Sequence, residues 1–210
     1  MESVDDVDNI ADLKLLHAKK IYLLLFFLAQ LIFVGDLHGF SQQTVSKIVH
    51  AVSEATAGLF PCFIAFSQQV EAIQIGLYNL AQFPQAVGCI DCTHVPIKSP
   101  GREVAQLYIN RKDYYSLNVQ IVCDAHRRIL DIVARWRGSV HDARIWDNCS
   151  LKDEFKLQSS KIKGVLLGDS GYPYKFYLLT PFLRPRTPAE ERYNASHVQT
   201  RNVVEHCFGE

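Results

Sequence analysis

The order of strand-like and helix-like segments in residues 86–208 is the feature that most constrains the fold. The run AVGCIDCTHVPIK predicts a first strand, and YYSLNVQIVCDAHRRILDIVARWRG predicts a hairpin of two strands that meet at DAHRR, where Asp124 is expected to be solvated. The segment SVHDARIWDNCSLKDEF then predicts a helix. GVLLGD and FYLLTPF predict short strands, and PAEERYNASHVQTRNVVEHCFGE predicts a last helix. Three successive strands followed by alternating helices and strands predict an α/β fold, a mixed sheet with helices against it.

The preceding part of the chain is predicted to be helical. Ser41 is a candidate N-cap for a helix that would end near Gly58. A helix, a short turn containing Gly39 and a second, capped helix are typical of a helix-turn-helix. The polar face of the second helix carries side chains that could reach base edges and phosphates: Gln42, Gln43, Ser46 and Lys47. A plain helical hairpin within a bundle is the alternative that the sequence leaves open.

Neither hydropathy nor net charge indicates a membrane protein. The most apolar run, IYLLLFFLAQLIFV at residues 21–34, would be about 21 Å long as a helix, shorter than the ~30 Å core of a bilayer. The formal net charge is +0, so the charge of the whole chain indicates neither a membrane surface nor nucleic acid as a partner. Residues 98–144 are locally basic, which is compatible with a polyanionic partner, but charge alone favours an ordinary solvated surface.

Three acidic residues stand out by their positions. Asp91 lies in the middle of the first strand and Glu205 on the last helix. Asp169 ends GVLLGD, where a sheet presents side chains to a ligand. A buried carboxylate is costly unless it is paired, and Mg²⁺ prefers such oxygen ligands. The three positions therefore predict a metal site suited to phosphodiester cleavage, for which two ions ~3.5–4 Å apart are typical. Arg201 lies four residues before Glu205, so a surface ion pair is the alternative role for that glutamate. Asp142 is predicted to be a helix N-cap, with a fourth site carboxylate as the alternative.

Two cysteines flank Asp91 in the pattern Cys-x-x-Cys, which could indicate a thiol metal or redox site. Successive side chains of a strand point to opposite faces, so Cys89 and Cys92 should point apart. A zinc site would also need a second pair of ligands at metal-binding spacing. The cysteines are therefore predicted to be free thiols, with Asp91 as the functional residue of this strand.

Eight segments taken together resemble the PIF/Harbinger transposases and, more closely, the animal harbinger-transposase-derived nucleases, which are DDE superfamily endonucleases. They are VGDLHGFSQQTVSKIV, GCIDCTHVPIKSP, NRKDYYSLNVQIVCD, RWRGSVHDARIW, LLGDSGYP, LLTPF, TPAEERYN and RNVVEHCFGE. The resemblance implies an RNase H-like fold with an Asp-Asp-Glu site formed by Asp91, Asp169 and Glu205. It also places a helix-turn-helix at roughly residues 34–57.

The resemblance further implies a domain layout and a function. An acidic segment at 1–20 would precede a helical region with the helix-turn-helix at 21–82 and an RNase H-like nuclease domain at 83–210. We expect that domain to be truncated at its C-terminus, because family members continue in a basic segment and further helices. The implied activity is hydrolysis of DNA with Mg²⁺ or Mn²⁺ by a two-metal mechanism, with Arg201 holding phosphates. The implied setting is the nucleus, with the cytoplasm as a second location and a separate Myb-like protein as partner. The alternative is a domesticated, non-catalytic DNA-binding or scaffold protein that retains the fold.

Overall fold

The computed structural model describes residues 41–66, 69–157 and 162–209. It divides into two compact units, Met1–Ile64 and Ala65–Glu210. In the first unit, helix α2 (Gln42–Gly58) is followed by the short helix α3 (Phe60–Phe63). Ser41 is the N-cap of α2 as predicted, because its Oγ accepts a hydrogen bond from the amide of Thr44. The first helix of the predicted helix-turn-helix and the apolar run 21–34 lie outside the described residues, so the predicted domain ranges stay predictions.

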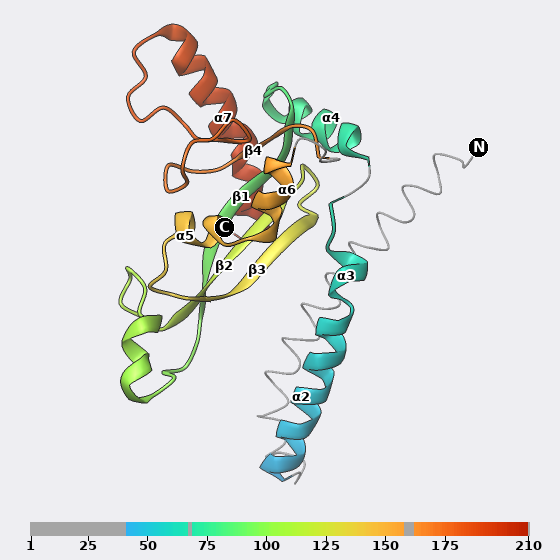
Figure 1. Cartoon of the computed structure of the whole chain (residues 1–210), viewed down its shortest axis with the longest axis vertical. Helices are drawn as coiled ribbons and strands as arrows, with labels where there is room; N and C mark the ends of the chain where they lie inside the picture. Colours follow the sequence, from blue (N-terminus) through green and yellow to red (C-terminus); the bar gives the residue numbers. More distant parts are fainter. Residues whose placement is uncertain (1–40, 67–68, 158–161, 210) are drawn as a thin grey trace, which may run out of the picture. The chain divides into compact units, whose positions relative to one another are not determined.

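The second unit is built on a five-stranded mixed sheet with the order β3-β2-β1-β4-β5 (Figure 1). Strands β1 (Ala86–Pro96), β2 (Ser116–Cys123) and β3 (Ile129–Arg137) are antiparallel neighbours. The 3₁₀-helix η1 (Arg102–Tyr108) lies between β1 and β2 in the chain. Strand β4 (Val165–Leu167) pairs in parallel with β1, and β5 (Leu178–Leu179) pairs in parallel with β4. The predicted mixed sheet is thereby confirmed.

Four helices accompany this sheet. Helices α4 (Val70–Ala81) and α7 (Pro188–Cys207) contact β1 and each other, and α5 (Asp142–Asp147) contacts β2. Helix α6 (Ser150–Lys156) follows α5. Helix α7 begins with a capping box, in which Thr187 and Glu190 satisfy each other's backbone amides. None of the helices in the described ranges is long and apolar enough to cross a bilayer.

The alternation of side chains along β1 separates the two faces of the sheet. The Sγ atom of Cys89 lies 3.5 Å from the carbonyl oxygen of Thr200 on α7, whereas the Sγ atom of Cys92 lies 3.2 Å from the hydroxyl of Tyr172. The two sulfurs therefore point apart, and all six cysteines of the chain are free thiols, as predicted. Asp91 shares the face of Cys89, so it points toward α7.

Two local predictions were wrong. The segment 139–155 forms two short helices instead of one, and the N-cap of α5 is His141, with Asp142 as the first helical residue. Asp124 is buried and not solvated. Its carboxylate accepts hydrogen bonds from the backbone amides of His126 and Arg128, each at 2.9 Å. Asp124 thus holds the β2–β3 turn together from inside, as aspartate does in turns that need an acceptor.

Candidate active site

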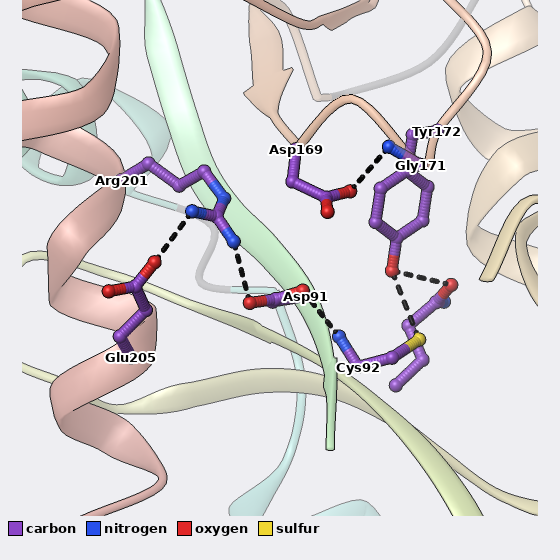
Figure 2. A network of polar contacts seen from close by, with 8 residues as sticks. Asp91, Cys92, Asp169, Gly171, Tyr172, Arg201 and Glu205 are labelled. Carbon is purple, nitrogen blue, oxygen red and sulfur yellow. Dashed lines mark hydrogen bonds and ion pairs between the residues drawn. The ribbon is translucent and has the colours of Figure 1, made fainter. Parts of the chain in front are cut away.

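The candidate site lies where β1 continues past the end of β4. The parallel register pairs Cys89 with Leu167, so two residues further along each strand Asp91 and Asp169 are level with each other. Asp169 lies two residues beyond the end of β4, on the loop that leads to Tyr172. The carboxyl end of a parallel strand is where an open sheet presents side chains to a ligand. The sheet therefore brings together two carboxylates that are far apart in the sequence (Figure 2).

Helix α7 brings a third carboxylate and an arginine to the same place. The guanidinium of Arg201 donates from Nη2 to Oδ2 of Asp91 and from Nη1 to Oε1 of Glu205, each at 2.7 Å (Figure 2). The side chains of Arg201 and Asp91 are 13% and 16% exposed, and that of Glu205 is 41% exposed. Arg201 and Glu205 thus form an ion pair, which is the alternative role that the sequence left open for Glu205. The pair is not confined to the surface of the helix, because Arg201 also binds Asp91.

Two of the three predicted carboxylates, Asp91 and Glu205, bind this guanidinium, and the third, Asp169, is near enough to raise its pKa. Burial lowers the pKa of Arg201, but Asp91, Glu205 and Asp169 outweigh that effect and raise it. Within the described ranges, no three His, Cys, Asp or Glu side chains are gathered closely enough to hold a metal ion. Arg201 is therefore the cation that holds the Asp91 and Glu205 side chains in place here.

The carboxyl group of Asp91 is buried enough for its pKa to change. Burial raises its pKa from an ordinary value of 3.8 to about 6, although Arg201 and a hydrogen bond from the amide of Cys92 act in the opposite direction. The negative charges of Asp169 and Asp142 add to the increase. Since burial outweighs the guanidinium and the amide, the charged form of Asp91 would be stabilised by a further cation.

We predict a pH-dependent contribution of Asp91 to the stability of the metal-free protein. Because the folded state binds this proton more tightly than the unfolded chain, the contribution is fully present below pH 3.8 and is lost as the pH rises through about 6. Asp91→Asn should abolish that contribution. The measurement is the free energy of unfolding in denaturant with EDTA at a series of pH values. A difference between wild type and variant that stays constant from pH 4 to pH 7 would contradict the raised pKa.

Asp142 lies close to the loop that carries Asp169. Its Oδ1 accepts a hydrogen bond from Nδ2 of Asn118 on β2 at 3.0 Å. A Cβ atom at Gly171 would lie 3.0 Å from Oδ1 of Asp169 and 3.5 Å from Oδ2 of Asp142. Only a residue without a side chain fits between these carboxylates without displacing them. The structure therefore places Asp142 as a fourth carboxylate beside the site and not as a helix N-cap.

Tyr172 belongs to the surroundings of the site and has no counterpart among the sequence predictions. It is buried, and its hydroxyl lies 3.2 Å from Sγ of Cys92 and donates to Oε1 of Gln120 at 3.5 Å. Burial raises the pKa of Tyr172, so the phenol is neutral. The sequence GDSGYP shows that a tyrosine follows Asp169 closely, but no sequence pattern indicates that this tyrosine contacts Cys92 on β1.

The predicted DNA-contacting residues fall into two separate units. Gln43, Ser46 and Lys47 are exposed on α2 in the first unit, while the side chain of Gln42 lies outside the described part. Arg201 lies in the candidate site of the second unit. Contacts of these residues with DNA stay a prediction.

The sequence matches the DDE superfamily endonuclease family over residues 90–210. The chain is 38% identical over 178 residues to proteins named putative nuclease HARBI1 from Bos taurus and Homo sapiens, a match that covers 83% of this chain and 50% of each relative. The protein of the same name from Rattus norvegicus is 39% identical over 175 residues, which cover 82% of this chain and 50% of the relative. The chain thus spans about half the length of these relatives. No solved structure matches it significantly.

Proposed function

The chain belongs to the DDE superfamily endonucleases, and we propose that it is a transposase-derived nuclease that hydrolyses phosphodiester bonds of DNA with the help of a divalent metal ion. The observation that carries the proposal is the convergence of Asp91, Asp169 and Glu205 from two neighbouring parallel strands and one helix. We further propose that the fold is RNase H-like. The strand order β3-β2-β1-β4-β5, with an antiparallel half and a parallel half, supports it.

The side chains present fit Mg²⁺ or Mn²⁺ by their chemistry. All donors at the site are carboxylate oxygens, which hard divalent cations prefer. Burial raises the pKa of Asp91, so its charged form is poorly solvated and would gain from a cation that replaces the lost contacts with water. Bound by Asp91, Asp169 and Glu205, one or two such ions would supply an activated water and a counter-charge for the departing oxygen.

The chain itself prepares two of these carboxylates. The amide of Cys92 donates to Oδ1 of Asp91 at 2.8 Å, and the amide of Gly171 donates to Oδ1 of Asp169 at 2.9 Å. Each backbone donor fixes one oxygen and thereby the rotation of its carboxylate. Glu205 reaches the site from α7, and Arg201 beside it is proposed to hold a phosphate of the substrate, because a guanidinium matches phosphate in shape and charge.

The setting of the activity is proposed from the family resemblance. DNA is the substrate, Gln42, Gln43, Ser46 and Lys47 on α2 contact it, and a Myb-like protein assists binding in the nucleus. The relatives' printed name, putative nuclease, supports a nucleic-acid substrate.

A second candidate function has one observation in its favour. Because Arg201 already bridges Asp91 and Glu205, the acidic site is held together without a metal ion. A domesticated DNA-binding or scaffold protein could retain such an ion-pair cluster as part of its fold.

The experiment that separates the two functions is cleavage of supercoiled plasmid DNA. We expect nicked and linear products in Mg²⁺ or Mn²⁺, and none in EDTA or in Ca²⁺, whose larger and more flexible coordination seldom supports the same chemistry. A gel-shift assay on the same DNA measures binding. Binding without cleavage in either metal would contradict the nuclease and favour the scaffold.

A further inference from the structure

The side chain of Arg201 lies where it excludes direct contact between Asp91 and Glu205. Two different nitrogens of one planar guanidinium reach the two carboxylates, one on β1 and one on α7, at 2.7 Å each (Figure 2). This distance is that of a strong, charge-assisted hydrogen bond. The guanidinium thus occupies one oxygen of each of two carboxylates, Oδ2 of Asp91 and Oε1 of Glu205, that are proposed to hold the metal.

Asp91 and Glu205 are the hydrogen-bond partners of this guanidinium among the described residues. Its Nε is buried and has no hydrogen-bond partner in the described part of the chain, so the two carboxylates supply the contacts that fix the side chain. An arginine held only by acidic partners loses its position when those partners turn to another cation.

The charges are unequal, which favours such an exchange. One positive charge faces Asp91 and Glu205 directly, with Asp169 close enough to raise the pKa of Arg201. A divalent ion brings twice the charge and approaches carboxylate oxygens to ~2.0–2.1 Å, nearer than any nitrogen donor. An oxygen in direct contact with such an ion has less capacity left for the guanidinium.

From these contacts we infer that Arg201 is a built-in competitor of the metal ion, which closes the acidic site in the metal-free protein and must leave Asp91 and Glu205 before the ion binds. The inference rests on the proposed metal-dependent function. It assigns Arg201 two positions: on the carboxylates without metal, and away from them with metal, where its guanidinium is available to a phosphate. The competition lowers the affinity of the site for metal in the absence of substrate.

The test is the affinity of the purified chain for Mn²⁺ without DNA, measured from the electron paramagnetic resonance signal of the free ion. Arg201→Gln keeps a polar side chain and removes the competing charge, so we expect Mn²⁺ to bind about tenfold more tightly than to wild type. Arg201→Lys retains the charge but cannot bridge two carboxylates in the same way, so its affinity should lie between the two. The matched control is Arg192→Gln, an exposed arginine on the same helix, which should bind Mn²⁺ as wild type does.

The outcomes separate this inference from the proposed function. Equal or weaker Mn²⁺ binding by Arg201→Gln, with circular dichroism showing a folded chain, would overturn the competition and leave the metal site standing. If Arg201→Gln does not fold, the Arg201→Lys variant decides in the same way. Absence of Mn²⁺ binding in wild type and in every variant would overturn the metal site itself.

Discussion

Replacing Asp91 or Asp169 by asparagine is expected to lower metal-dependent DNA cleavage by about 10²- to 10³-fold, the loss typical when one preorganised electrostatic group is removed from an active site. Asparagine retains the shape of the side chain and its hydrogen bond from the neighbouring amide, but it lacks the negative charge that attracts a hard cation. The measurement is the initial rate of plasmid nicking in Mg²⁺ at equal protein concentration.

A matched control is Asp153→Asn on α6. The Asp153 side chain is 76% exposed and contacts only Lys156, at 3.5 Å, among the hydrogen bonds and ion pairs of the described residues. This variant removes one negative charge of the same kind without touching the site, so it should cleave at the wild-type rate. Wild-type cleavage by both folded site variants would show that the carboxylates of β1 and the β4 loop take no part in the reaction.

Trp146→Ala is expected to reduce the free energy of unfolding by about 3–5 kcal/mol, the range for removing a large aromatic side chain from a packed core. Trp146 is 0% exposed and lies on α5, with its ring centroid 6.2 Å from that of Tyr177. The same helix begins at Asp142, so the tryptophan anchors the element that carries the fourth carboxylate. Denaturant unfolding followed by circular dichroism gives the value, and Trp146→Phe should lose less because it leaves a smaller cavity.

The second tryptophan of the chain provides the comparison. Trp136 on β3 is only half-buried, and Arg135 lies over its ring at 5.9 Å. Trp136→Ala removes the same atoms from a position that the core does not enclose, so its loss should be clearly smaller. Equal losses in the two variants would contradict the assignment of Trp146 to the core.

The strands, and the positions of Asp91 and Asp169 relative to them, could be predicted because their signals are local. Alternation along β1 predicted that Cys89 and Cys92 point apart, and the end of GVLLGD predicted that Asp169 follows a strand. Both inferences need only the geometry of one strand. The parallel pairing of β4 with β1 then sets Asp169 level with Asp91.

The position of Arg201 could not be predicted, because it depends on a contact between distant parts of the chain. Helical spacing indicated that Arg201 and Glu205 lie on one stripe, but not which side of the helix faces the sheet. The break between α5 and α6 was missed for a different reason. Nδ2 of Asn148 donates to the carbonyl of Arg144 at 2.7 Å, and such a side-chain bond competes with the helix in a way that apolar periodicity does not register.

The site residues lie far apart in the sequence, so the ribosome adds them to the chain at different times. Asp91 and Arg201 are 110 residues apart, so at ~5–20 residues per second a ribosome needs roughly 5–20 s between them. The three antiparallel strands β1, β2 and β3 end at Arg137, so all of them are synthesised within that interval, before β4, β5 and α7. During this interval the chain contains Asp91 without the arginine of α7 that binds it. Translation therefore delivers the antiparallel strands before it delivers the side chain that closes the site.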